Sequence, residues 1–227
     1  MNDRLTLLDY LTFAVFAVQA AFAVHVGVNG PAEATLPLHW NAALQVDRWG
    51  TGLEFAAVSG GLTLLGLLVC AGLGLGARRA DAADDPARGK ALRVGQGIAL
   101  FVFAVLGLLT AVMTLGGLPP EGAEVLSMAA VSLIFAGLGA FLGRVAPNPL
   151  IGVRTPWTFK SRRAWDRANR LAGRLYFLLG LAGLVAAPLA PQPAGTFALV
   201  AGALAAAAWA VFESWRVWRA DPDRQPF

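Results

Sequence analysis

The chain has 227 residues, of which 57% are hydrophobic and only 14% charged, with a formal net charge of +4. Such an apolar fraction exceeds what one water-soluble core of this size buries, so the composition excludes an ordinary soluble domain and indicates an integral membrane protein. The basic balance does not indicate direct nucleic acid binding, because the cations gather at the ends of apolar runs rather than along one polar face.

Six apolar segments approach or reach the length of about 20 residues that a membrane-spanning helix needs. In chain order they cover residues 7–26, 55–77, 94–115, 125–145, 171–189 and 197–218. The sequence therefore predicts an all-α integral membrane protein, a single domain over residues 1–227 folded as a bundle of six transmembrane helices. The alternative for the first run is a cleaved signal peptide, for which Asp9 and Tyr10 are poorly placed.

The distribution of cations predicts the orientation of these helices. With both the N-terminus and the C-terminus in the cytoplasm, Arg48 alone of the 18 Lys and Arg residues lies on the outer side. Cytoplasmic loops of membrane proteins carry such an excess of cations. We therefore expect six crossings, with the lipid bilayer as the first partner of the chain.

The longest outer segment, residues 27–52, contains the sequence LPLHWNAALQVDRWG. His39, Asp47, Glu33 and Glu54 are potential metal ligands, but none of them has the spacing of a known site. We interpret the segment as a hydrogen-bonded loop at the membrane surface, with tryptophans at headgroup depth.

The inner segment, residues 144–174, contains an RTPW core of Arg154, Thr155, Pro156 and Trp157. A proline after a β-branched residue requires extended backbone before it. We expect the Arg154 guanidinium to make several directed hydrogen bonds. Ser161 is the predicted N-cap of the next helix.

Beyond that cap, Arg163, Arg167, Arg170 and Arg174 recur as one cationic stripe, in which Asp166 can pair with Arg170. The alternative interpretation of this region is purely interfacial. On that view the stripe reaches anionic headgroups, and Trp157 and Trp165 are membrane anchors.

The sequence offers no assembled active site. His25 and His39 both lie on the outer side, and Asp9 and Glu213 are single carboxylates near inner helix ends. The lone Cys70, inside an apolar run, excludes a thiol metal cluster. We therefore predict a protein that is not an enzyme, with no catalytic residue, no cofactor and no metal.

Two blocks of residues resemble the two halves of the SdpI-like family, membrane proteins related to the immunity protein against a bacterial sporulation-delaying toxin. The first block is similar to the outer motif of the family and comprises Leu36, Pro37, His39, Trp40, Asn41, Asp47, Arg48, Trp49 and Gly50. The second is similar to its C-terminal signature and comprises Pro147, Asn148, Ile151, Gly152, Arg154, Thr155, Pro156, Trp157, Thr158, Trp165, Arg170 and Gly173. Where the family often has histidine before the arginine of the second block, this chain has Asn169.

This resemblance implies a multi-pass protein of the bacterial cytoplasmic membrane that gives resistance to, or senses, a secreted antimicrobial peptide and can sequester a transcriptional regulator. The residues expected to contact the peptide toxin outside are His39, Trp40, Asn41, Asp47 and Arg48. Those expected to contact the regulator or the lipid surface inside are Asn148, Arg154, Thr155, Pro156, Trp157, Trp165 and Arg170. A small-solute transporter or channel is the alternative function, and a lipid-modifying enzyme is the third possibility. No charge falls in the middle of a predicted span, which argues against proton-coupled transport.

Overall fold

The computed structural model describes residues 5–41, 45–116, 120–145, 147–148 and 150–225. Residues 42–44 of the outer segment and residues 146 and 149 of the inner segment lie outside this description, as does Arg4 among the predicted inner cations. The elements in chain order are α1 (Leu7–Asn29), β1 (Leu36–Trp40), β2 (Val46–Gly50), α2 (Gly52–Ala82), α3 (Pro86–Leu115), α4 (Pro120–Leu142), α5 (Pro156–Phe159), α6 (Arg162–Ala186) and α7 (Ala194–Ala220).

Long helices arise at all six predicted apolar segments, and several begin at caps that the sequence supplies. Thr6 and Asp9 form a capping box at the start of α1, and Thr51 and Glu54 form another at the start of α2. The Ser161 hydroxyl accepts a hydrogen bond from the α6 backbone at 2.9 Å, which confirms the predicted N-cap. Such caps satisfy backbone N–H groups that the first turn of a helix leaves without partners.

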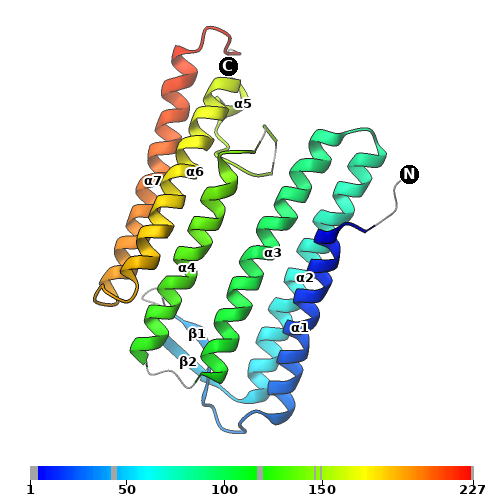
Figure 1. Ribbon diagram of the computed structural model, residues 1–227, viewed down its shortest axis with the longest axis vertical. Helices are drawn as coiled ribbons and strands as arrows, with labels where there is room; N and C mark the ends of the chain where they lie inside the picture. Colours follow the sequence, from blue (N-terminus) through cyan, green and yellow to red (C-terminus); the bar gives the residue numbers. More distant parts are fainter. Residues whose placement is uncertain (1–4, 42–44, 117–119, 146, 149, 226–227) are drawn as a thin grey trace.

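The long helices form two groups of three, α1 to α3 and α4 with α6 and α7 (Figure 1). Among the described residues, the two groups meet where α3 packs against α4. The first group packs around Phe16, Cys70 and Leu100, and the second around Met128 and Leu199. Each group therefore has its own apolar core.

Glycines set the close approach of α4 to α6. A side-chain carbon added at Gly139 would overlap the backbone of Phe177, and one added at Gly180 would overlap the backbone of Ala136. Small residues at such contacts let helices in lipid pack backbone to backbone.

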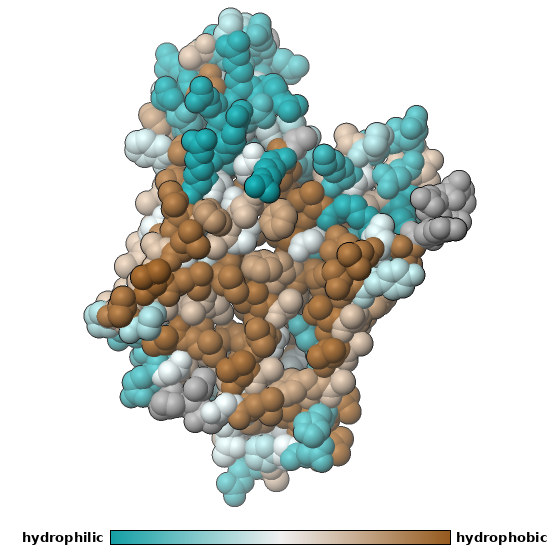
Figure 2. Space-filling model, viewed as in Figure 1, coloured by the Kyte–Doolittle hydropathy of each residue, from teal (hydrophilic) through white to brown (hydrophobic). Residues whose placement is uncertain are grey.

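Within the described residues, five helices are long and apolar enough to cross a membrane: α1, α2, α3, α4 and α7. The first half of α6 carries the cationic stripe, and this helix is not among them. Figure 2 shows a broad apolar belt with hydrophilic residues toward both ends of the molecule. Leu62 and Leu68 on α2 and Leu204 on α7 are among the large apolar side chains that are exposed. A belt of this kind is solvated by lipid, so the chain is a helical membrane protein.

The outer segment contains a hairpin that the sequence did not predict. β1 and β2 pair antiparallel, with Leu36 opposite Gly50 and Trp40 opposite Val46. Leu36 packs on Phe55 of α2. The hairpin lies at the end of the bundle away from both termini (Figure 1), and the segment interpreted as a hydrogen-bonded loop thus contains two paired strands.

Candidate functional site

The inner segment folds back on itself around Asn148. Its side-chain oxygen accepts hydrogen bonds from the backbone N–H groups of Leu150 and Ile151, both at 2.8 Å. Its amide nitrogen donates to the Ile151 carbonyl at 3.1 Å. Asn148 is buried, so this predicted contact residue shapes the loop from within.

Asn169 joins the loop to α6. Its side-chain oxygen accepts from the Val153 N–H at 2.7 Å, and its nitrogen donates to the Trp165 carbonyl at 3.0 Å. Gly152 faces this amide with φ +124°, and a Cβ there would lie 2.6 Å from the Asn169 oxygen. The position where the family often has histidine therefore holds an asparagine that uses both its acceptor and its donor.

Trp165 is a structural core residue. Its side chain is fully buried, and its indole Nε1 donates to the Val145 carbonyl at 2.8 Å. The interpretation of Trp165 as a membrane anchor is wrong, because the ring fills the space between the loop and α6. Trp157 is half-buried and Pro156 exposed.

The RTPW core is fastened to α7. Thr155 and Thr158 form a capping box that starts α5. The Thr155 hydroxyl also lies 2.9 Å from the Ser214 hydroxyl, and all three side chains are buried. A buried chain of hydroxyls holds its members in one arrangement, since each loses a partner if another moves.

A second connection reaches the C-terminal end. The Ser161 hydroxyl donates to the Asp221 carboxylate at 2.5 Å, and Arg163 lies 3.6 Å from the same carboxylate. The hydrogen bond from Ser161 holds the pKa of Asp221 below its ordinary value of 3.8, with smaller help from Arg163. The loop, α6 and the end of α7 thus form one hydrogen-bonded unit.

Arg154 and Arg170 differ in how far their contacts agree with the sequence-based predictions. Arg154 is exposed, and its guanidinium makes one long hydrogen bond, 3.4 Å to the Leu150 carbonyl, among the described residues. The prediction of several directed bonds from Arg154 is wrong, because its side chain leaves the loop toward solvent. Arg170 pairs with Asp166 at 3.9 Å, as predicted, and donates to the Asp166 carbonyl at 3.0 Å.

The hairpin carries the other set of predicted residues. His39 Nδ1 lies 2.6 Å from the Asp47 carboxylate, and both side chains are exposed. Arg48 lies 3.7 Å from Glu54. Asn41 accepts from the Gln45 N–H at 3.0 Å, which stabilises the connection between the strands. No group of three or more His, Cys, Asp or Glu side chains is placed to hold a metal among the residues described.

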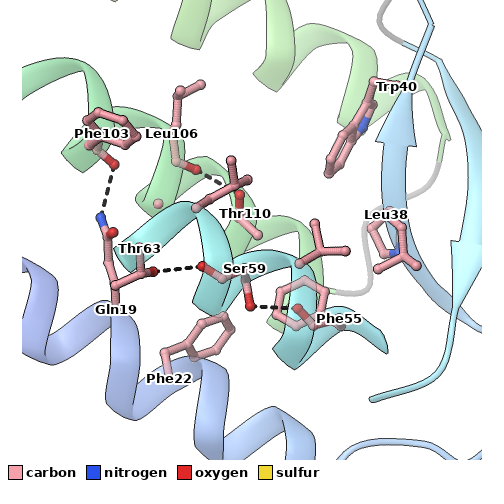
Figure 3. Close-up of a pocket in the computed structure, with 14 residues that line it drawn as sticks. Gln19, Phe22, Leu38, Trp40, Phe55, Ser59, Thr63, Phe103, Leu106 and Thr110 are labelled. Carbon is pink, nitrogen blue, oxygen red and sulfur yellow. Dashed lines mark hydrogen bonds between the residues drawn. The ribbon is translucent and has the colours of Figure 1, made fainter. Parts of the chain in front are cut away.

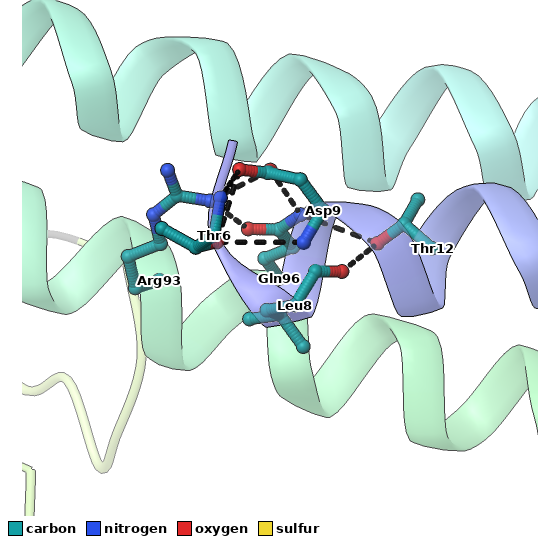
Figure 4. Close-up of polar contacts among 6 residues, drawn as sticks. All are labelled: Thr6, Leu8, Asp9, Thr12, Arg93 and Gln96. Atoms are coloured by element: carbon teal, nitrogen blue, oxygen red, sulfur yellow. Dashed lines mark hydrogen bonds and ion pairs between the residues drawn. The ribbon is translucent and has the colours of Figure 1, made fainter. Parts of the chain in front are cut away.

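The structure adds a polar cluster that sequence reasoning missed. The Asp9 carboxylate accepts from Arg93 Nη1 at 2.7 Å and from Gln96 Nε2 at 3.1 Å (Figure 4). Gln96 also donates to Thr12 at 3.2 Å, and it is fully buried. Asp9 is half of an ion pair between α1 and α3, a partnership that the sequence did not indicate. The signal available in the sequence was the spacing of Arg93 and Gln96, which places both polar side chains on one face of α3.

These features define a multi-pass helical membrane protein with an ordered polar loop at one end and an exposed hairpin at the other. Residues 144–213 match the model of the SdpI/YfhL protein family. This match covers about a third of the chain and confirms that the second motif block is similar to that family. The first block, in the hairpin, lies outside the matched residues. No curated protein and no solved structure matched the chain.

Proposed function

We propose that the chain is an immunity or signal-receptor protein that meets a secreted antimicrobial peptide at the hairpin and acts on a cytoplasmic regulator through the inner loop. The observation that carries this proposal is the SdpI/YfhL match over residues 144–213, which contains the whole inner loop. The exposed His39 and Asp47 pair supports a contact role for the hairpin, because its side chains present charge and hydrogen-bonding groups outward.

The proposal includes six crossings of a bacterial cytoplasmic membrane with both termini inside. Support comes from α6, which packs between α4 and α7 and at 25 residues extends about 37 Å at 1.5 Å per residue. The termini, the connection of α2 to α3 and the inner loop lie at one end of the bundle, and the hairpin lies at the other (Figure 1). Apart from Arg48 on the hairpin, the described cations gather toward the first of these ends, the one that the positive-inside rule assigns to the cytoplasm.

Thiol labelling tests this topology. In a background without Cys70, single cysteines replacing Asn41 or Glu121 should react with an impermeant reagent in intact cells. A cysteine replacing Asp84 should react only after the cells are opened. Labelling of the Asp84 position alone in intact cells would invert the orientation.

Tolerance to peptides tests the function. Expression in a sensitive bacterium should raise tolerance to at least one membrane-active peptide of a panel. The double substitution His39→Ala with Asp47→Ala should reduce that tolerance, whereas Gly60→Leu, on a part of α2 where an added Cβ meets no atom within 4 Å, should leave it unchanged. Unchanged tolerance across the panel, with normal protein level, would reject immunity.

A small-solute transporter is the second candidate, and the Asp9–Arg93 pair favours it. Ionisable groups buried among membrane helices often mark a transport route, and the Asp9 side chain is only 5% exposed. Altered solute uptake without altered tolerance would select this candidate. A changed lipid composition on expression would instead select a lipid-modifying enzyme, the third candidate.

A further inference from the structure

A cavity of about 120 Å³ lies beneath the hairpin, enclosed by α1, α2, α3 and β1. Figure 3 shows Trp40 and Leu38 of β1 on one side of it and Gln19 and Phe22 of α1 on another, with α2 and α3 between them. Pro37 and Trp40 of the first motif block are among the residues that line it.

The wall of the cavity is mostly apolar, and its hydroxyl groups already donate their hydrogens to backbone carbonyls. Ser59 donates to the Phe55 carbonyl at 2.7 Å, and Thr110 donates to the Leu106 carbonyl at 2.8 Å. Gln19 donates to the Phe103 carbonyl at 2.9 Å. A water molecule needs two to four polar partners to remain in such a space, so the cavity favours a hydrocarbon occupant.

One donor is left over. The indole Nε1 of Trp40 is buried and has no hydrogen-bond partner among the described residues. Buried polar groups without partners are uncommon in folded proteins and call for an explanation. A hydrogen-bond acceptor on a bound molecule would supply the missing partner.

The cavity opens sideways. Val58, Leu62 and Leu106 line it and are also substantially exposed, at 40%, 55% and 42% of their accessible surface. All three lie on helices that are long and apolar enough to cross a membrane. In the bilayer these side chains face lipid, so a ligand enters from the membrane rather than from water.

We propose that this cavity binds one acyl chain of a lipid from the leaflet on the hairpin side, and that the carbonyl group of the chain accepts a hydrogen bond from Trp40 Nε1. An acyl ester or amide combines the two required features, a slim hydrocarbon segment and an acceptor next to it. An apolar cavity of about 150 Å³ holds benzene, so the space accommodates a short part of one chain. A peptide segment fits less well, because Trp40 Nε1 can satisfy only one of its several backbone polar groups.

Photocrosslinking in lipid nanodiscs tests the proposal without any assumption about immunity. The full chain would be reconstituted with phosphatidylcholine that carries a diazirine near the carbonyl end of one acyl chain, and adducts would be mapped by mass spectrometry. We expect adducts to concentrate on cavity residues such as Phe22 and Val58. Ser59→Leu, which fills the cavity, should reduce them at least fivefold. Gly60→Leu adds the same side chain one position away, and it should not reduce them.

Trp40→Phe separates the hydrogen bond from the apolar contact. It should weaken labelling between about twofold and tenfold, the worth of one hydrogen bond, while an ether-linked analogue without the carbonyl should label parent and variant alike. If Ser59→Leu lowers the yield of folded protein, Thr110→Leu narrows the cavity from α3 instead.

Three results would overturn the proposal. The first is labelling of equal intensity on the cavity and on exposed α7 positions such as Leu204, which would indicate surrounding lipid only. The second is labelling that neither filling variant reduces in folded protein. The third is displacement of the lipid adducts by an apolar peptide without an acyl group, which would assign the cavity to a peptide.

Discussion

The burial of the Asp9–Arg93 ion pair predicts that loss of Arg93 destabilises the protein more than loss of Asp9. The Asp9 carboxylate accepts four hydrogen bonds, from the Thr6 N–H and hydroxyl, Arg93 and Gln96. The Asp9 side chain is 5% exposed and that of Arg93 is 19% exposed. Arg93→Met therefore leaves a buried carboxylate without its cation, whereas Asp9→Leu leaves an arginine that can reach water along its own stem.

Removal of one partner of a buried pair costs roughly 3–5 kcal/mol of unfolding free energy, and we expect Arg93→Met in that range. Asp9→Leu should cost less, about 1–3 kcal/mol, the penalty of unmade hydrogen bonds. The double variant should be less destabilised than Arg93→Met alone, because two apolar side chains then replace the pair without leaving a buried charge.

Equilibrium unfolding in mixed micelles of dodecyl maltoside and sodium dodecyl sulfate, followed by far-UV circular dichroism, measures these differences. The double-mutant cycle gives the coupling directly, and close pairs couple by about 0.5–3 kcal/mol. Leu204→Ala, on the lipid-exposed face of α7, controls for general effects of substitution. Additive effects of the two substitutions, within about 0.5 kcal/mol, would refute the reasoning.

Three further predictions concern the inner segment and its contact with Asp221 at the end of α7. Gly152→Ala should destabilise the protein by about 1–3 kcal/mol, the cost of a strained backbone, because φ is +124° and the new carbon meets the Asn169 oxygen. The loss should appear as a lower midpoint of thermal unfolding in detergent, whereas Arg154→Lys should leave that midpoint nearly unchanged. A larger loss for Arg154→Lys than for Gly152→Ala would contradict the geometry. Trp165→Phe should cost at least about 1–3 kcal/mol of unfolding free energy, since it leaves the Val145 carbonyl without this partner and the smaller ring leaves part of a fully buried space empty. An unchanged denaturant midpoint would contradict the core role of Trp165. Asp221→Asn should lower the unfolding free energy at pH 7. Because the pKa of Asp221 is lowered in the folded protein, the ionised carboxyl stabilises the fold above pH 3.8 and progressively less below it, so the difference in unfolding free energy between variant and parent should shrink as the pH falls below 3.8. A difference that stays constant down to about pH 2.5 would exclude Asp221 as the titrating group.

The sequence predicted the helices well because lipid imposes a simple requirement, a run of apolar residues long enough to cross. It also predicted the Ser161 cap and the Asp166–Arg170 pair, since both depend on residues only three or four positions apart. Local rules of this kind need no knowledge of the tertiary fold.

The contacts that the sequence did not predict join distant residues or depend on the course of the backbone. Asp221 bonds to Ser161 across 60 positions, and Asp9 to Arg93 across 84. No periodicity within one segment indicates such partners. The hairpin was missed for a different reason: its strands are only five residues long, and the segment between them carries no Asn-Gly or Asp-Gly turn signal.

Arg154 shows the limit of an argument from side-chain chemistry alone. The versatility of a guanidinium correctly indicates what an arginine can bind, but the direction of the side chain is set by the loop, and here it is set by Gly152, Asn169 and the Thr155 cap. These three residues are buried or tightly packed, whereas Arg154 is exposed. The motif therefore stabilises the loop through its small and polar members and leaves its arginine available at the surface.

The arrangement of the two helix groups constrains how the proposed function can work. The hairpin and the cavity belong mainly to the group of α1 to α3, while the inner loop is bonded to α6 and α7. In the part of the chain that the structure describes, helices of the two groups pack against each other along α3 and α4, where the Phe101 ring lies against Gly137. The Gln45 to Glu124 hydrogen bond at 3.1 Å joins the hairpin to α4. A peptide bound outside can change the inner loop only if it favours one arrangement of a packed contact over another. The packing of α3 on α4 and the Gln45 bond are two such contacts, and the approach of Ile151 to Gly95 of α3 is a third.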